Sequence, residues 1–394
     1  MTVECRMKYV LRPLLAVLPL FFYCAGTQPP QKIKAVEPAQ ELRGIWITRF
    51  DWARQNPQQL QARMEEILQG SQRLGFNAVF FQVRGQAETL YPSPLEPWSE
   101  IFKNGAPDFD PLAWAVQRSH ELGLEFHAYV NLLPMWNGRN APLAPDHLFH
   151  RHGPHVAAES SWVCFAADGR PMELNEYYYL NPALPQVRRY LKEVIRHLVA
   201  TYDIDGLHFD RVRYPGPEYT RDPYSNTQYP LDSTRTGLTR HDWARRQLTG
   251  LVEDVAAEAL LIKPYLQISC ASWGLYKTDD VPGYERFGDG FHTYHQDALL
   301  WLDRGIMDFI VPMIYWDLQD PKPNAQEVWL DFKRRSPLYR RIIPGLIAKP
   351  EWVANGEMVR QMQTLRQLGA NGQLLFSWSG VASAGTESSP LAAV

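Results

Sequence analysis

From residue 41 onward, short runs of apolar residues alternate with longer stretches in which apolar residues recur every three or four positions. The short runs are typical of buried strands, and the longer stretches are typical of amphipathic helices. The pattern predicts eight strands, over residues 42–48, 78–83, 124–130, 204–210, 266–271, 308–314, 341–347 and 373–377. It predicts seven intervening helices, over residues 58–74, 111–122, 185–202, 241–262, 298–304, 325–334 and 357–368.

A helix between successive strands indicates parallel pairing, because a parallel connection needs a dozen or more residues. Eight such units predict an α/β fold with a single (β/α)8 TIM barrel over residues 41–380. An open dinucleotide-binding sheet is disfavoured, since no GxGxxG motif follows the first strand. Residues 381–394 make only a short tail, so the last helix of the barrel is expected to be short or missing.

The segments that leave the predicted strands are long, and the segments that lead from the helices back to the strands are tight. The long segments cover about residues 131–181, 211–240, 272–296 and 315–324. In barrels of this kind the loops after the strands form the catalytic face. These loops are rich in Trp and Tyr, whose rings suit the apolar faces of sugars, although some of the rings are expected only to pin the loops. The sequence therefore predicts a sugar-binding cleft on this face.

The composition and the N-terminal residues indicate the class of protein and its cellular location. The 394 residues are 45% hydrophobic and 21% charged, with a formal net charge of −3, which is a globular composition without the basic surface of a nucleic-acid-binding protein. Arg6, Lys8 and Arg12 precede an apolar run over 13–23, which is the pattern of a secretory signal. We therefore expect a signal peptide over 1–26, a polar tether over 27–40 and a protein exported to the periplasm or cell surface.

The cysteines leave alternatives open. Cys24 allows a lipoprotein signal, in which a lipid on this Cys would be the only attachment to a membrane, such as the outer membrane. Tyr23 departs from the small residue that usually precedes such a Cys. Cys164 and Cys270 fit either a disulfide or two buried free thiols, and no CxxC motif points to zinc or redox chemistry. We expect a monomer.

The strand over 204–210 gives the strongest chemical signal. Strand alternation turns Leu207 and Phe209 toward the helices and turns His208 and Asp210 toward the barrel axis. Asp210 then lies at the carboxyl end of the fourth strand, where catalytic residues of these barrels gather. A buried carboxylate needs a charged or protonatable partner, and Arg211 and Arg213 follow at once, either to pair with it or to hold substrate. We predict Asp210 as the catalytic nucleophile or base.

Glycoside hydrolysis needs a second carboxyl group, which protonates the leaving oxygen. The sequence offers Asp317 or Glu88 for this acid, each of them in a loop after a predicted strand. The candidates for substrate binding lie near the ends of predicted strands or in the loops that follow, and they are Gln82, Arg84, His127, Asn131, His208, Arg213, Tyr214, Trp273, Tyr315 and Trp316.

Several segments together resemble the glycosyl-hydrolase-like family ten, a family of exported bacterial barrels. These segments are ELRGIWI at 41–47, FQVR at 81–84, YPSPLEPWS at 91–99, FDPL at 109–112, HAYVN at 127–131, YDIDGLHFD at 202–210, RYP at 213–215 and PMIYW at 312–316. The resemblance runs from about residue 41 to 379 and implies a (β/α)8 fold with glycosidase chemistry. At least one branch of the family acts on peptidoglycan glycan strands that have lost their stem peptides, so such strands are a candidate substrate. Glu88 and Met313 depart from the family pattern, in which Asp and Gln are often found at these positions.

Two other classes of protein compete with this interpretation. A metal-dependent hydrolase barrel usually begins with an HxH pair on its first strand, and the first strand here has no His. We therefore expect neither a metal nor a cofactor. A non-catalytic barrel that binds glycan in the envelope would keep the cleft and Asp210 but lack an acid/base pair, and this alternative stays open. A serine hydrolase is disfavoured, because the chain has no GxSxG elbow.

Overall fold

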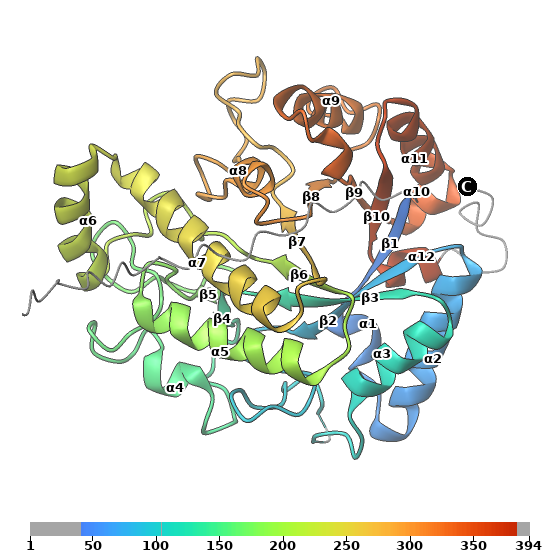
Figure 1. The fold of residues 1–394 in the computed structure, drawn as a ribbon, viewed down its shortest axis with the longest axis horizontal. Helices are drawn as coiled ribbons and strands as arrows, with labels where there is room; N and C mark the ends of the chain where they lie inside the picture. The colour runs from blue at the N-terminus through green and yellow to red at the C-terminus, as the bar shows by residue number, and fades with distance from the viewer. Residues whose placement is uncertain (1–40, 104, 384–394) are drawn as a thin grey trace, which may run out of the picture. The chain divides into compact units, whose positions relative to one another are not determined.

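The computed structural model describes residues 41–103 and 105–383. Eight parallel strands in this part of the chain form a closed barrel, with helices around it (Figure 1). Going round the barrel, the hydrogen-bonded neighbours are β1 (Leu42–Ile47), β10 (Gly372–Phe376), β9 (Gly345–Ile347), β8 (Phe309–Ile314), β7 (Gln267–Ser272), β6 (Gly206–Asp210), β3 (Glu125–Asn131) and β2 (Ala78–Arg84), which pairs with β1 again. The predicted TIM barrel is confirmed.

The predicted helices are also present. They are α2 (Pro57–Arg73), α3 (Pro111–Glu121), α5 (Pro185–Thr201), α7 (Arg240–Ile262), α8 (Ala298–Asp303), α9 (Ala325–Arg335) and α11 (Glu357–Gln367). Their starts follow from local chemistry: the side chain of Asp110, for example, accepts hydrogen bonds from the first backbone N–H groups of α3, and Pro111 supplies a preset first turn. The seventh strand is shorter than predicted, because Pro344 has no N–H to donate to the sheet.

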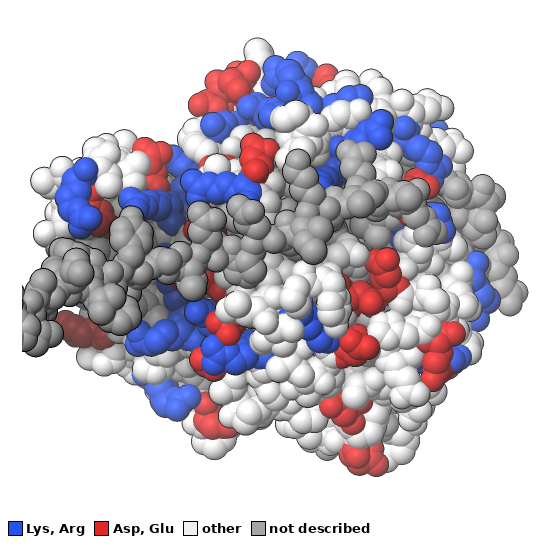
Figure 2. Space-filling view, viewed as in Figure 1, with Lys and Arg blue, Asp and Glu red and all other residues white. Residues whose placement is uncertain are grey.

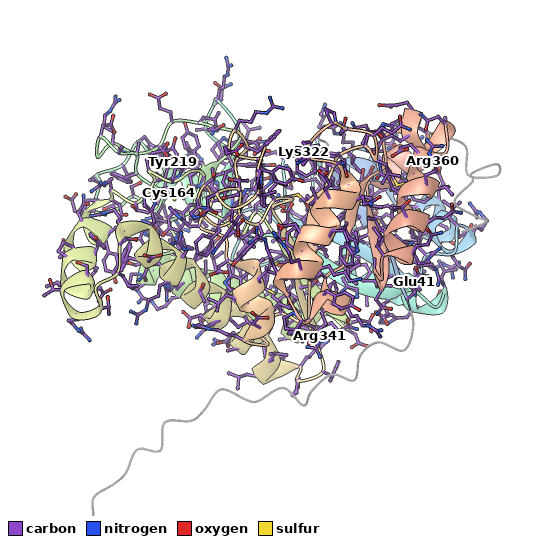
Figure 3. All side chains as sticks on the ribbon, turned by 90° about the horizontal axis from the view of Figure 1, so that it is seen from above. Glu41, Cys164, Tyr219, Lys322, Arg341 and Arg360 are labelled. Carbon is purple, nitrogen blue, oxygen red and sulfur yellow. The ribbon has the colours of Figure 1, made fainter. Side chains whose placement is uncertain are left out.

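The last strand is followed by a five-residue helix, α12 (Trp378–Ala382), as the short tail predicted. The predicted signal peptide and tether, with Cys24, lie outside the described residues. Where the described chain begins, Glu41 pairs with Arg366 of α11 at 2.8 Å. The view from above in Figure 3 shows Glu41 on the same side as Arg360, which also belongs to α11.

Strand alternation produces two apolar layers. Leu207 and Phe209 join a large cluster between the strands and the helices, whereas Trp46, Phe80 and Phe309 fill the inside of the barrel. The aliphatic and aromatic interior closes the barrel below its mouth, so a ligand can enter only from the ends of the strands.

The long loops carry elements that the periodicity did not predict. After β3 the chain forms α4 (Leu148–His152) and the antiparallel pair β4 (Pro134–Trp136) and β5 (Tyr178–Tyr179). The remaining unpredicted elements are α1 (Arg49–Trp52), α6 (Pro223–Thr236), α10 (Pro350–Ala354) and the 3-10 turn Tyr339–Arg341. In Figure 1 the β4–β5 pair and α6 lie on the same side of the barrel.

Cys164 and Cys270 are both buried and free, so the structure selects the free-thiol alternative over the disulfide. On the face shown in Figure 2, Lys and Arg side chains are interspersed with Asp and Glu side chains rather than gathered in one patch. Over the described ranges, no helix is both long and apolar enough to cross a membrane.

Packing of α12 on α2 generates a stability prediction. A Cβ atom on Gly70 would stand 2.2 Å from the ring of Trp378, which is buried. Ala would favour the helix by about 1 kcal/mol, but overpacking against a ring that cannot move costs about 1–3 kcal/mol. We expect Gly70→Ala to lower the free energy of unfolding in urea by about 1 kcal/mol.

Gly250→Ala in α7 is the matched control, because its Cβ would meet only the end of the flexible Arg188 side chain, at 2.9 Å. This variant should leave the free energy of unfolding unchanged or raise it. Equal stabilisation by both substitutions would contradict the packing of Trp378 against α2.

Candidate active site

Asp210 ends β6 and faces Asn131, the last residue of β3, in the register of the two strands. The Tyr129 hydroxyl, two residues back on β3, donates a hydrogen bond to Oδ2 of Asp210 at 2.7 Å. The backbone N–H of Arg211 donates to Oδ1 at 2.6 Å. The two carboxylate oxygens are therefore held by one strand neighbour and by the start of the following loop.

Arg211 is the point where the chain leaves the strand, and its φ of 55° lies in the left-handed region that non-glycine residues rarely adopt. This conformation aims the backbone N–H at Asp210 while the side chain reaches Glu176, with which it forms an ion pair. The guanidinium also lies over the ring of Tyr177 at 5.2 Å. Strain of this kind persists where the surroundings over-determine a functional geometry.

The electrostatics favour an ionised Asp210. Burial alone would raise the pKa of this carboxyl, but the nearby guanidinium groups of Arg211 and Arg213 and the hydrogen bond from Tyr129 bring the pKa below its usual range. A carboxylate that stays charged in a place poor in water is suited to act as a nucleophile or as a base.

Asp210 lies in a cleft with a cavity volume of about 630 Å³ at the mouth of the barrel. The size is that of a typical small-molecule or oligomer-binding site. Its walls are mainly rings with a few charged and amide groups. The aromatic residues that line the cleft are Trp46, Phe50, Tyr129, Tyr177, Tyr179, Trp273, Tyr294, Tyr315, Trp316 and Phe376.

The cleft contains a second carboxyl group that the sequence analysis did not select. Glu176 precedes β5 in the long loop after β3, and it lines the cleft with its side chain 53% exposed. The run Asn175–Tyr179 sets this carboxylate next to three Tyr residues, and that combination was the available signal. A loop of this length has no periodicity, so the sequence does not indicate which of its carboxylates faces the cleft.

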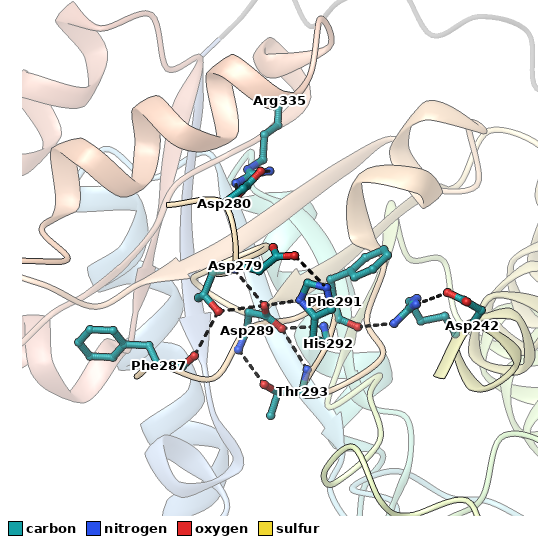
Figure 4. Close-up of polar contacts among 11 residues, drawn as sticks. Asp242, Asp279, Asp280, Phe287, Asp289, Phe291, His292, Thr293 and Arg335 are labelled. Carbon is teal, nitrogen blue, oxygen red and sulfur yellow. Dashed lines mark hydrogen bonds and ion pairs between the residues drawn. The ribbon is translucent and has the colours of Figure 1, made fainter. Parts of the chain in front are cut away.

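Another wall of the cleft comes from the loop over residues 273–297, and Asp289 organises this loop (Figure 4). Asp289 is buried and accepts hydrogen bonds from the backbone of Thr278, His292 and Thr293. These bonds, with the one from the His292 ring, offset burial and bring the pKa of Asp289 below its usual range. The ordered loop places Tyr294 against Trp273, with ring centroids 4.3 Å apart.

Seven predicted site residues line the cleft together: Gln82, Asn131, Asp210, Arg213, Trp273, Tyr315 and Trp316. Six others do not. His127 lies at the foot of the barrel, stacked on Phe80 at 4.4 Å, and Tyr214 is fully buried behind the loop after β6. His208 lies inside the barrel, below the cleft.

His208 supports the site from below rather than touching a ligand. Its Nε2 accepts a hydrogen bond from the Trp46 indole at 3.1 Å, so the proton is on Nδ1, which donates to Ser269 Oγ at 2.9 Å. Burial lowers the pKa of His208 to about 3. The ring is therefore neutral at ordinary pH, and it adds no charge next to Asp210.

Arg84 was expected to hold sugar, and the structure corrects this. A bulge between Gln82 and Arg84 shifts the register of β2 against β3, so Arg84 aligns with outward-facing Val130. The guanidinium is fully buried, pairs with Glu96 at 2.6 Å and donates to the carbonyl of Asn131. It fixes the loop after β2 and does not line the cleft.

Neither predicted acid reaches the cleft. Asp317 closes a turn, where its Oδ1 accepts a hydrogen bond from the backbone of Gln319 at 2.7 Å. Glu88 is 1% exposed and accepts hydrogen bonds from Ser99 and from the backbone of Glu100. Both carboxylates are used by the local structure of their own loops.

No group of three or more His, Cys, Asp or Glu side chains in the described part of the chain is arranged to hold a metal ion. The site therefore consists of two carboxylates, three arginines, amide groups and rings at the carboxyl ends of parallel strands. A closed parallel barrel with these groups at its mouth is a barrel of the glycoside hydrolase type.

The chain belongs to the glycosyl hydrolase-like 10 family, whose model matches residues 41–346. It is 28% identical over 353 residues to the glycosyl hydrolase YngK of Bacillus subtilis, covering 84% of this chain and 66% of YngK. It is 27% identical over 375 residues to the glycosyl hydrolase DigH of Escherichia coli K12, covering 84% of this chain and 80% of DigH. The match therefore leaves about a third of YngK uncovered.

Solved structures with the same fold include the glycoside hydrolase domain of PgaB (BpsB) from Bordetella bronchiseptica. This domain superposes with a TM-score of 0.66 at 17% identity, over 88% of this chain and 97% of that domain. A β-galactosidase from Marinomonas ef1 gives a TM-score of 0.57 at 12% identity, over 86% of this chain and 54% of that one. At these identities the likeness concerns the fold.

The contacts of Asp210 predict the effect of removing one donor. Tyr129→Phe takes away the hydroxyl that stabilises the charged carboxylate, so the pKa of Asp210 should rise. The titration can be followed by NMR on protein with 13C-labelled Asp carboxyls, with the signal assigned by its loss in Asp210→Asn. Tyr177→Phe, which removes a cleft hydroxyl that accepts from Arg49, should leave the titration unchanged. An unchanged pKa in Tyr129→Phe would refute the assigned role.

The burial of Glu88 should make the stability of the protein depend on pH. Burial raises its pKa from 4.5 to about 7, so the folded protein holds this proton more tightly than the unfolded chain. Stability should fall as pH rises from 4.5 to 7, by about 3 kcal/mol from this group. Gln mimics the protonated form, so Glu88→Gln should be more stable than the wild type at pH 8, with little difference at pH 4.5. Urea unfolding at both pH values measures this, with exposed Glu173→Gln as control; a pH-independent difference would contradict it.

Proposed function

We propose that this protein is an exported glycoside hydrolase that cleaves O-glycosidic bonds of a polysaccharide, with Asp210 and Glu176 as its carboxyl pair. The observation that carries the proposal is the ionised Asp210 at the end of β6, in an aromatic cleft that holds a second carboxyl group. Two carboxyl groups flanking the bond, one acting as acid and one as nucleophile or base, are what glycoside hydrolysis requires.

Asp210 takes the role of nucleophile or base, because its oxygens are fixed by Tyr129 and by the Arg211 backbone and its charge is stabilised. Glu176 takes the role of the acid that protonates the leaving oxygen, and to carry that proton it must first part from Arg211, with which it forms an ion pair. Its side chain is half exposed to the cleft, where an incoming sugar can reach it. Arg211 contacts both carboxyl groups and so links their positions in the cleft.

The cleft supports a polymer as substrate. The loops after β1 and β7 stand on opposite sides of the barrel, four strands apart in either direction. Phe50 lines the cleft from the first loop with 45% of its surface exposed, and Trp273 lines it from the second. Rings on both sides of Asp210 suit sugar units on both sides of the bond.

The resemblance to exported envelope barrels supports peptidoglycan glycan strands without stem peptides as the first substrate to test. The basic and apolar start of the chain supports export to the periplasm or cell surface, with lipid attachment at Cys24 as one route. A monomer without metal or cofactor is sufficient for this chemistry.

The test uses the full chain, a panel of polysaccharides that includes peptide-free peptidoglycan strands, and mass spectrometry of new reducing ends. We expect Asp210→Asn to lower kcat at least about a thousandfold and Glu176→Gln at least about a hundredfold, because each removes a group that acts in the transition state. Asp317→Asn lies outside the cleft and should stay within about threefold of the wild type.

Glu173→Gln is the matched control for Glu176, since it changes an exposed carboxylate of the same loop that does not line the cleft. Full turnover in Glu176→Gln would remove this residue from the mechanism. Glycan binding by the wild type without any new reducing ends would support the alternative of a non-catalytic glycan-binding barrel.

A further inference from the structure

The guanidinium of Arg213 lies in the cleft wall, and one of its nitrogen atoms has no hydrogen-bond acceptor among the described residues. The side chain is only 6% exposed, and its guanidinium lies over the ring of Trp273 at 5.2 Å and over that of Tyr294 at 5.5 Å. Its Nη1 is buried and has no hydrogen-bond partner within the described ranges. Flat rings thus fix the position of the fork while leaving N–H donors available to a ligand.

Two other arginines at the ends of barrel strands have acceptors for their guanidinium groups. Arg84 has the carboxylate of Glu96 and two backbone carbonyls, and Arg211 has Glu176. A buried guanidinium whose donors lack acceptors is costly, because neither water nor protein replaces its lost hydration. The Arg213 site is therefore incomplete until a ligand supplies oxygen atoms.

The side chains that line the cleft carry a net positive charge. Its lining includes Arg49, Arg211 and Arg213 but only two carboxylates, Asp210 and Glu176, although the whole chain has a formal net charge of −3. Glu176 is already paired with Arg211. Two cationic side chains then share the single charge of Asp210, so the cleft attracts an anion.

We propose that Arg213 binds a carboxylate of the substrate, and that the glycan taken into the cleft carries acidic sugar residues. A carboxylate matches the guanidinium fork with two parallel hydrogen bonds and also neutralises its charge, whereas a sugar hydroxyl offers one acceptor and no charge. This inference rests on the proposed function, because it names the class of sugar that the same cleft accepts.

A competing role for Arg213 is to keep Asp210 ionised and nothing more. In that case its loss would raise the pKa of Asp210 and would weaken the action on acidic and neutral glycans equally. Recognition of a carboxylate predicts a different result: removing Arg213 should weaken the binding of acidic glycans and leave the binding of their neutral counterparts unchanged. The two roles therefore separate on matched pairs of ligands.

The experiment measures binding by microscale thermophoresis at pH 7 with the full chain. The probes are oligosaccharides from peptide-free peptidoglycan strands, polygalacturonate, alginate and hyaluronan, each intact and with its carboxyl groups reduced to alcohols. We expect at least one intact glycan to bind about tenfold or more tightly than its reduced form, and this preference should shrink at high salt. Arg213→Gln should abolish the preference without weakening the binding of the reduced form.

Two variants keep the result interpretable. Arg213→Lys keeps the charge but loses the fork, so it should retain only part of the preference, and it serves if the Gln variant does not fold. Arg286→Gln removes the same charge from an exposed position of the 273–297 loop and should bind like the wild type. Equal binding of intact and reduced glycans by the wild type, or an intact preference in both Arg213 variants, overturns the inference.

Failure of the proposed function gives a different signature. A carboxylate preference that depends on Arg213, with no new reducing ends from any glycan, supports the inference and overturns hydrolysis. New reducing ends from reduced or neutral glycans, at rates equal to those from acidic ones, support hydrolysis and overturn the inference.

Discussion

The site depends on keeping one buried carboxylate charged. Burial favours the neutral form of Asp210, and this must be outweighed by the guanidinium groups of Arg211 and Arg213 and by the Tyr129 hydroxyl. Each contribution requires a feature of the backbone. The hydroxyl requires β3 and β6 to be in register, and the Arg211 N–H requires a left-handed residue directly after the strand. His208 below the carboxylate is neutral and contributes no charge, so the stabilisation comes from the two arginines and the hydroxyl.

The positive charges that stabilise Asp210 need their own support, and this explains the long loops. Arg211 is held by Glu176 and Tyr177, both from the loop after β3, and Arg213 is held by rings from the strand end and loop after β7. Asp289 in turn orders the second loop through its bonds to backbone N–H groups. The barrel alone would present Asp210, but the loops make the surroundings in which its charge persists.

Regular parts of the chain could be predicted from the sequence, because periodicity fixes both the element and the side on which a residue lies. Asp210 and Asn131 followed from strand alternation in this way. Arg84 was placed wrongly because a bulge in β2 breaks the alternation by one position. Glu88 and Asp317 were expected in the cleft but lie outside it, because their oxygens accept hydrogen bonds within their own loops, which no sequence pattern reveals.

Glu176, in contrast, lies in the cleft although no sequence pattern predicted it there. Its place beside the cleft is set by the β4–β5 pairing and by the ion pair with Arg211, contacts between residues 35 positions apart. The ion pair also ties the two carboxyl groups of the cleft to one residue. The two carboxyl groups are thereby coupled electrostatically through a single guanidinium. An anionic ligand on Arg213 would act against this coupling, because it would take up positive charge that Asp210 otherwise shares.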